Sequence, residues 1–449
     1  MKKNLVSLFS GCGGMDIGFE GRFKVPKETI NTKINKEWIE KEDDFYYYLK
    51  ETIFETKFAN DINQYAKKAW NDYFLKKKTI EQNEENSKNE IFKVGSIVDI
   101  VKEYQNGNTN VFPQHVEIVT GGFPCQDFSV SGKRKGFDSH KDHNGKLIEN
   151  NKNEEVKNTI PSEETRGKLY MWMKEVIKIT KPKIFIAENV KGLTNLGEVE
   201  KIIQADFSDI DSKEDKKEGY LVLTKVLHSG MYGVPQSRER IFFIGFKKSA
   251  LTKTALLELN KAIISEKYTP YPIPTHKLNG EIHTSSLKDL MINFTKSKAV
   301  LKDLEEPENS TDFSQMYYSK AKFMGAHCQG QKEVNLEKLA PTIRAEHHGN
   351  IEYRRLSKEN GGKINKELEK GYKERRLTLR ECARIQTFPD DYNFVIPKKG
   401  VKNRFEVSAS VGYKLVGNAV PPLLAYHLAK KIESNWELYF GKEETKKLF

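Results

Sequence analysis

The chain has 449 residues, of which 37% are hydrophobic and 31% are charged, so it can bury a large core and is long enough for two or three domains. Lys and Arg exceed Asp and Glu by 12, a balance that suits a polyanionic partner without proving one. No run approaches the ~18 apolar residues of a membrane span. Four cysteines in so long a chain exclude a disulfide scaffold and favour a reducing, cytoplasmic setting.

The first half of the sequence alternates strand-like and helix-like segments, which predicts a mostly parallel α/β sheet. The expected strands are 4–9, 56–60, 116–120, 183–187, 220–228 and 240–246. The expected helices are 63–74, 167–180 and 199–207. Polar or charged stretches between them are interpreted as surface insertions: 24–51, 76–90, 138–165 and 209–218.

The alternation stops after residue 246, and the irregular patterning of 248–375 predicts a second domain. From Arg354 to Arg384 there are 11 basic and 5 acidic residues. A basic amphipathic helix is expected at 379–387, and a further helix at 419–435 follows Gly417-Asn418.

Cys125 follows an apolar strand and a Gly-Gly-Phe-Pro turn, so its thiol is expected at the strand's carboxyl end. Ligands of open α/β sheets bind at that edge, where a cysteine is placed for chemistry on a bound molecule. The alternative is a small buried hydrophobic residue, because free Cys is among the most buried residue types.

Three other strand ends carry candidate groups, each with a plainer alternative. The glycines of 9–14 allow a ligand close to backbone N–H groups, although ordinary turns use glycine too. Asp61 can accept hydrogen bonds from a ribose or cap the next helix. Glu188 can donate a proton from a raised pKa or serve as a cap. Arg238 and Arg240 would reach the same rim, or pair at the surface.

Taken in order, these motifs resemble those of the DNA (cytosine-5)-methyltransferases of the bacterial restriction–modification type. The resemblance is carried by 9–14, Pro124-Cys125-Gln126 with Ser129, Glu188-Asn189-Val190, 236–240, 380–384 and Gly417-Asn418-Ala419. Each motif is modest alone, but the whole set in the family's order is specific, and it spans residues 4 to about 430. Pro341-Thr342-Ile343 resembles a short element of that family's target-recognition domain.

The resemblance implies a Rossmann-like S-adenosylmethionine-dependent methyltransferase sheet with a second, irregular target-recognition domain. The implied division is a catalytic and cofactor-binding domain at 1–247, the target-recognition domain at 248–385, a hinge at 386–408 and a returning C-terminal segment at 409–449.

The resemblance also implies S-adenosyl-L-methionine as cofactor and no metal. Asp61 would hold the ribose, Ile62 would lie against the adenine, and Asn418 would close the pocket. Ser96 stands where the family often has Asp and departs from its pattern there. The implied cofactor residues are Phe9, Gly11, Gly13, Gly14, Asp61, Ile62, Ser96, Ile97, Pro124, Leu169 and Asn418.

In the implied reaction Cys125 attacks C6 of a flipped-out cytosine, Glu188 protonates N3, and Arg240 binds O2 with support from Arg238. The expected DNA contacts are Gln126, Ser129, Ser131, Lys133, Arg134, Arg166, Thr342, Arg344, Arg354 and Arg355.

The expected partner is double-stranded DNA, bound by a monomer, and a restriction endonuclease acting on the same site is a candidate partner. One alternative is a related enzyme acting on tRNA cytosine, against which the long 248–375 segment argues, since duplex specificity needs a major-groove reader. The other is a catalytically silent DNA-binding protein, against which intact Cys125, Glu188 and Arg240 argue.

Overall fold

The computed structural model describes residues 2–77, 90–124, 168–195, 198–210, 219–280, 285–345 and 350–442. The predicted insertion at 138–165 and most of those at 76–90 and 209–218 lie outside these ranges. Among the helices described, none has the length and apolar character needed to cross a membrane.

Seven strands form the central sheet in the order β6-β5-β1-β7-β8-β10-β9. Neighbouring strands are parallel except at β10, which runs antiparallel to both β8 and β9. This arrangement confirms the predicted α/β class. The strands are β1 (Lys3–Leu8), β5 (Phe54–Asp61), β6 (Phe92–Val94), β7 (Ile118–Gly122), β8 (Ile184–Val190), β9 (Tyr220–His228) and β10 (Glu239–Lys247).

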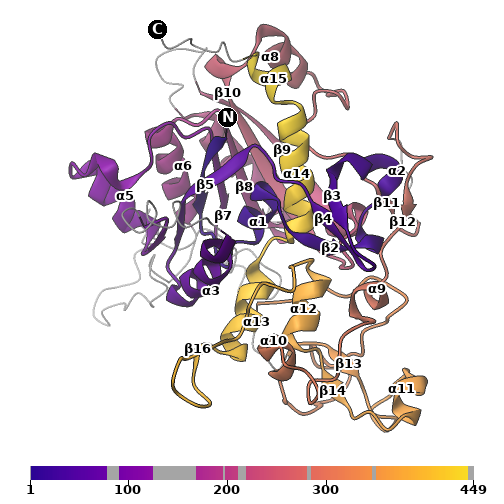
Figure 1. Ribbon diagram of the computed structural model, residues 1–449. Helices are drawn as coiled ribbons and strands as arrows, with labels where there is room; N and C mark the ends of the chain where they lie inside the picture. The colour runs from indigo at the N-terminus through magenta and orange to yellow at the C-terminus, as the bar shows by residue number, and fades with distance from the viewer. Residues whose placement is uncertain are drawn as a thin grey trace, which may run out of the picture.

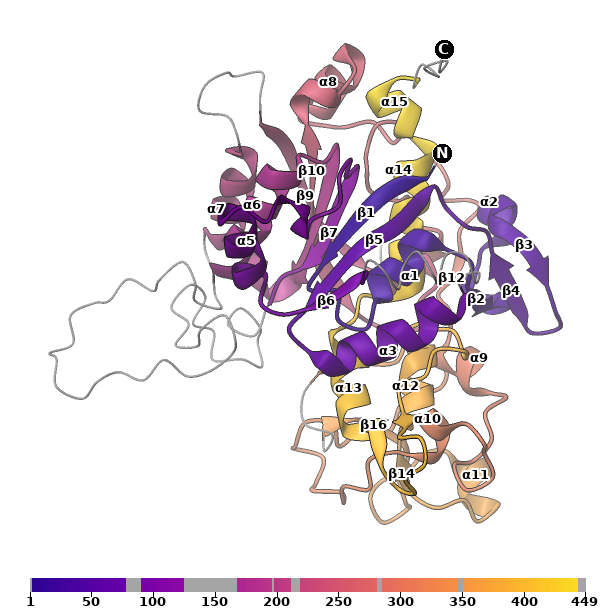
Figure 2. The ribbon, with the colours of Figure 1, turned by 60° about the vertical axis from the view of Figure 1, so that its left-hand side comes forward.

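Helices cover both faces of the sheet, which explains the apolar runs of its strands. One face packs on α5 (Ile97–Gln105), α6 (Leu169–Thr180) and α7 (Val199–Ser208), and the other on α1 (Gly14–Glu20), α3 (Gln64–Phe74) and α14 (Pro422–Ser434) (Figure 2). Successive β1 residues Leu5 and Val6 belong to different hydrophobic clusters, as the two-residue period of a strand requires.

The close packing of α1 against α14 depends on glycine at two positions one turn apart. A Cβ at Gly14 would lie 2.3 Å from the carbonyl oxygen of Val420, and one at Gly18 would lie 2.4 Å from that of Pro422. Because backbone cannot give way to such a contact, these glycines let the C-terminal helix lie directly on the helix that follows β1.

A distal lobe, made of the described residues between 297 and 418, lies below the sheet (Figure 1). Its elements are short: α9 (Ser297–Leu301), α10 (Phe313–Met316), β13 (Tyr353–Arg355), α11 (Asn365–Glu369), β14 (Arg375–Arg376), α12 (Leu379–Ile385), β15 (Ile396–Pro397), β16 (Phe405–Val407) and α13 (Ala409–Asn418). The predicted hinge at 386–408 contains the β15–β16 pair.

The residues directly after 248 do not belong to this lobe. Helix α8 (Lys253–Leu259) lies beside α15 (Trp436–Phe440) at the opposite end of the sheet, and the Thr252 amide donates to the carbonyl of Tyr439 over 2.8 Å. The Tyr271 hydroxyl donates to the carbonyl of Phe242 in β10 over 3.0 Å. The structure therefore places the start of the second lobe later than residue 248.

Two further expectations about local structure are corrected. The stretch 24–51 is a folded unit with strands β2 (Lys24–Pro26), β3 (Ile39–Glu42) and β4 (Tyr46–Leu49) and helix α2 (Thr32–Asn35), and Val25 and Leu49 are fully buried. The helix expected to be amphipathic, α12, is buried at all seven positions. Its Arg380 and Arg384 are satisfied by Asp312, Asp303 and Asp390 rather than by solvent.

Candidate active site

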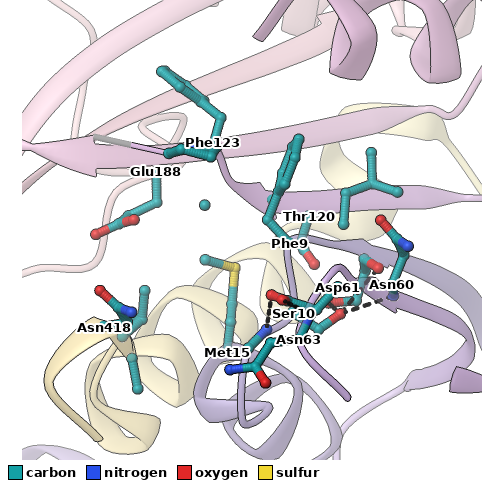
Figure 3. A pocket seen from close by; sticks show the side chains of 18 of the residues that line it. Phe9, Ser10, Met15, Asn60, Asp61, Asn63, Thr120, Phe123, Glu188 and Asn418 are labelled. Carbon is teal, nitrogen blue, oxygen red and sulfur yellow. Dashed lines mark hydrogen bonds between the residues drawn. The ribbon is translucent and has the colours of Figure 1, made fainter. Parts of the chain in front are cut away.

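A cavity of about 440 Å³ lies at the carboxyl ends of β1, β5, β7 and β8, with α13 closing one side. Glu188 and Asn418 lie at one end of the cavity, and Asn60 and Asp61 lie at the other (Figure 3). Of the eleven predicted cofactor residues, ten line this cavity: Phe9, Gly11, Gly14, Asp61, Ile62, Ser96, Ile97, Pro124, Leu169 and Asn418.

Gly13 is the predicted residue that does not line the cavity, and its role is to shape the loop. Phe9, Gly11 and Gly13 all have positive φ, at 52°, 54° and 78°. A Cβ at Gly13 would lie 2.7 Å from the Trp70 ring, whereas one at Gly11 would meet nothing within 4 Å. The loop after β1 therefore folds tightly on its inner side and leaves open space toward the cavity at Gly11.

Asp61 fastens this loop to the end of β5. One carboxylate oxygen accepts a hydrogen bond from the Gly11 amide over 2.9 Å, and the other accepts one from the Asn63 amide over 2.8 Å. Burial raises the pKa of Asp61, although these backbone hydrogen bonds oppose the shift. The N-cap of α3 is Asn63, so Asp61 is not the helix cap.

The adenine end predicted from the sequence is built by β6 and the start of α5. The Asn60 side chain donates to the carbonyls of Lys93 and Gly95, each over 3.0 Å, and so holds the turn before Ser96 at the cavity. Ser96 is the N-cap of α5 and accepts from the Val98 amide over 3.3 Å. Ile62 remains 47% exposed, which leaves its apolar face available to a planar ring.

Glu188 and Arg240 form an ion pair in the cavity wall. Strand register places Glu188 beside Gly122 at the end of β7, and Arg240 lies across from Val190 at the start of β10. Arg240 Nε lies 2.9 Å from Glu188 Oε1, and Glu188 is 7% exposed. Burial raises the pKa of Glu188, while Arg240 and then Arg238 oppose the shift. A carboxyl in this state can hold a proton closer to neutral pH than an exposed one.

Arg238 was expected at the catalytic site, but it does not line the cavity. Its buried guanidinium donates to the carbonyls of Ile343 and Gly417, each over 3.1 Å. Thr342 donates to the carbonyl of Ser237 over 2.5 Å in the same junction. Arg238 therefore holds the distal lobe and α13 against the start of β10, close enough to Glu188 to act on its charge.

Seven predicted residues lie outside the described part of the chain: Cys125, Gln126, Ser129, Ser131, Lys133, Arg134 and Arg166. Pro124, which directly precedes Cys125 in the sequence, lines the cavity.

The predicted DNA contacts at Arg354 and Arg355 are contradicted by burial. Arg355 is 1% exposed and pairs with Glu306 over 2.7 Å and with Glu367 over 2.5 Å, and Arg354 pairs with Glu367 over 2.6 Å. The six arginines of the stretch 354–384 are buried inside the lobe, whereas its five lysines are exposed, so the number of basic residues in the sequence overstates the charge at the surface. Arg344 is half-buried and bonds Glu352 over 2.7 Å.

The sequence reasoning missed a buried carboxyl behind the loop, Asp16. It is fully buried and accepts from the Ser7 hydroxyl over 2.6 Å and from Trp70 Nε1 over 2.8 Å. Burial raises the pKa of Asp16 to about 7. The signal was an aspartate between the apolar residues Met15 and Ile17, directly after the glycine-rich loop. Met15, Thr120 and Phe123 also line the cavity and were not predicted.

The mostly parallel sheet, the loop after β1 and the cavity at the strand ends are those of the Rossmann-like methyltransferase fold. A comparison with protein families finds a match to the C-5 cytosine-specific DNA methylases over residues 3–150 and 160–434. The chain belongs to this family and is a DNA (cytosine-5-)-methyltransferase.

Curated relatives match over nearly the whole chain. The Type II methyltransferase M.BsuRI of Bacillus subtilis is 27% identical over 98% of this chain and 81% of its own length. The Type II methyltransferase M.FnuDI of Fusobacterium nucleatum is 30% identical over 99% of this chain and 97% of its own length. Among solved structures, the S. pombe Dnmt2 methyltransferase aligns with 97% of this chain and 99% of its own chain, at 14% identity and a TM-score of 0.49.

Proposed function

We propose that the protein transfers a methyl group from S-adenosyl-L-methionine to C5 of a cytosine within one short sequence of duplex DNA. The observation that carries the proposal is the ion pair of Glu188 and Arg240, which faces the same cavity as Pro124, the residue before Cys125. Activation of a pyrimidine ring needs an acid, a cation and a nucleophile, and Cys125 is the proposed nucleophile.

The residues at the cavity fit the proposed cofactor. Open space at Gly11 and an exposed apolar side chain at Ile62 suit a nucleoside, and Asp61 can accept hydrogen bonds from ribose hydroxyls beside those it already accepts. When bound, this cofactor supplies an electrophilic methyl group. The chain's own residues have the separate task of making cytosine C5 nucleophilic.

Cys125 begins the reaction as a thiolate, whose sulfur forms a bond to C6 of the flipped-out cytosine. Glu188 donates a proton to N3 as the electron pair of the ring moves there, and Arg240 binds O2 and stabilises the developing charge. C5 thereby becomes the nucleophile. After methylation, loss of the C5 proton restores the ring double bond, the sulfur–C6 bond breaks, and Glu188 recovers its proton.

The distal lobe is the proposed reader of the DNA sequence. Its candidate contacts are Thr342, which bonds Ser237 just before β10, and Arg344, which bonds Asn350 within the lobe. The segment after Cys125, with Gln126, Ser129, Ser131, Lys133, Arg134 and Arg166, is proposed to meet DNA around the flipped base. The protein is proposed to act as a monomer and to protect host DNA from a restriction endonuclease with the same site.

A trapping experiment tests the mechanism. Duplex DNA containing 5-fluorocytosine should form a covalent adduct with the wild-type protein in the presence of S-adenosyl-L-methionine, because fluorine cannot leave C5 as a proton does. Cys125→Ala should form none. An adduct with tRNA but not with duplex DNA would favour the tRNA enzyme, and adduct formation by Cys125→Ala would contradict the assignment of the nucleophile.

A further inference from the structure

The folded segment 24–51, here called the brace, is fixed to the sheet domain through α14. The Trp38 ring packs edge-on against Tyr426 and His427, with ring centroids 5.3 and 4.7 Å apart. The Tyr426 hydroxyl donates to the carbonyl of Lys50 over 3.0 Å. These side chains are buried, so the contacts anchor the brace to α14.

The brace also binds the linker, here the described residues between 275 and 295, which leads into the distal lobe. The Asn31 side chain, 1% exposed, donates to the carbonyls of Thr275 and Leu290, each over 2.9 Å. The Thr295 hydroxyl donates to the carbonyl of Glu28 over 2.9 Å. Losing a buried amide's partners costs about 1–3 kcal/mol, so the path of this linker is set by the brace.

The brace also touches the distal lobe itself, beside α9 and α12 (Figure 1). The Tyr46 hydroxyl lies 3.3 Å from Asp303 and 3.2 Å from Asp390. Both carboxylates bind Arg384 of α12, at 2.6 and 2.8 Å. Lys302 pairs with Glu28 over 2.6 Å. Tyr46 of the brace thus contacts the two carboxylates of the distal lobe that bind Arg384.

The cation–ring contacts inside the brace keep Tyr46 in place. Lys24 lies 4.4 Å from the centroid of the Tyr46 ring and 3.7 Å from Asp390. Tyr48, two residues further along β4, instead directs its hydroxyl to Asp43 of the brace itself, over 3.0 Å. The two tyrosines therefore differ in whether their hydroxyl reaches the distal lobe.

We propose that the brace fixes the angle of the distal lobe to the sheet domain, and that Tyr46 is a positioning residue for DNA binding. The inference rests on the proposed function in one respect, that the distal lobe reads DNA. DNA must contact the lobe and the cavity at the same time, so a lobe free to tilt pays an added ordering cost on binding. The proposed S-adenosyl-L-methionine cavity takes most of its lining from the sheet domain and only Leu415, Gly417 and Asn418 from α13 of the lobe, so the ordering cost falls mainly on DNA binding.

The test compares Tyr46→Ala with its matched control Tyr48→Ala in the full chain. Dissociation constants for duplex DNA are measured by fluorescence anisotropy, and those for S-adenosyl-L-methionine by calorimetry. We expect Tyr46→Ala to weaken DNA binding about tenfold, as for losing hydrogen bonds to charged groups, with cofactor affinity unchanged within about twofold. Tyr48→Ala should change neither. Lys302→Ala, at an exposed pair, should weaken DNA binding about two- to fivefold.

Hydrogen exchange separates this proposal from the proposed function. Amides of α9 and α12 should exchange faster in Tyr46→Ala than in Tyr48→Ala, whatever the protein binds. If amides exchange faster in Tyr46→Ala but the wild type does not bind DNA, the brace does position the lobe, and the proposal that the lobe reads DNA is contradicted. Equal exchange in both variants, or a parallel loss of cofactor and DNA affinity in Tyr46→Ala, would overturn the brace.

Discussion

Arg240 Nε lies 2.9 Å from Glu188 Oε1, and the two side chains come from antiparallel neighbours, β10 and β8. The pair has one consequence for the acid. Burial favours the protonated form of Glu188, whereas the guanidinium favours the carboxylate. Loss of the guanidinium should therefore raise the pKa of Glu188, and exposure of Glu188 to solvent should lower it.

Removing the charge of Arg240 should shift the pH dependence of turnover upward. In Arg240→Gln the opposing guanidinium is lost, so the pKa of Glu188 rises and the general acid stays protonated to higher pH. The falling limb of the pH–rate profile should move to higher pH, while the maximal rate drops by at least about 10²-fold through the lost stabilisation of O2. A limb that stays in place would show that Glu188 is not the titrating acid.

Replacing the acid itself should separate chemistry from binding. Glu188→Gln keeps the size of the side chain and removes the transferable proton, so we expect turnover to slow by at least about 10²-fold. Affinity for S-adenosyl-L-methionine, measured by calorimetry, should hardly change. A collapse of that affinity would make Glu188 a structural residue.

Arg355→Ala should reduce stability rather than phosphate binding. Its guanidinium is 1% exposed and bonds Glu306 and Glu367. Its removal takes one charged partner from each of these carboxylates, which keep Arg375 and Arg354, so the expected loss of stability is about 1–3 kcal/mol. Urea unfolding measures this loss, with the exposed Lys358→Ala as control. A stable variant whose DNA binding loses about one unit of salt dependence would instead indicate a phosphate contact.

Asp16 should make stability fall as pH rises. Its pKa is about 7 in the folded protein against 3.8 for the ordinary carboxyl, so between these values the unfolded chain releases a proton that the folded chain keeps. Unfolding free energy then decreases by up to about 1.4 kcal/mol per pH unit across that window. Asp16→Asn lacks this contribution, so its stability relative to wild type should rise with pH.

Urea unfolding at several pH values between 4 and 7.5 measures the Asp16 effect. Asp99→Asn, at an exposed position on α5, controls for the loss of a carboxylate. A constant difference in unfolding free energy between wild type and Asp16→Asn would show that Asp16 is ionised throughout.

The sheet and most of the cavity could be predicted because both follow from local patterns. An apolar run followed by Gly or a polar residue indicates the end of a strand. Asp61 and Glu188 could therefore be predicted from the residues next to them in the sequence. The expected length of β8 was wrong, since the strand continues through Glu188 to Val190.

Burial in the distal lobe could not be predicted, because it depends on partners far along the chain. Arg355 is buried by Glu306, 49 residues away, and nothing near either residue in the sequence indicates the pair. The contacts of the brace could not be predicted for the same reason, because they too join residues far apart in the sequence. Tyr46 meets Asp390 across 344 residues, so a charged, aromatic stretch that forms an inter-lobe contact was interpreted as a surface insertion.

The most direct test of cytosine methylation is bisulfite sequencing of DNA from cells that lack other cytosine methylation and express this chain. We predict that cytosines resist conversion within one short recurring sequence, and that this protection disappears with Cys125→Ala. Full conversion at every cytosine in cells shown to contain the folded wild-type protein would contradict the account.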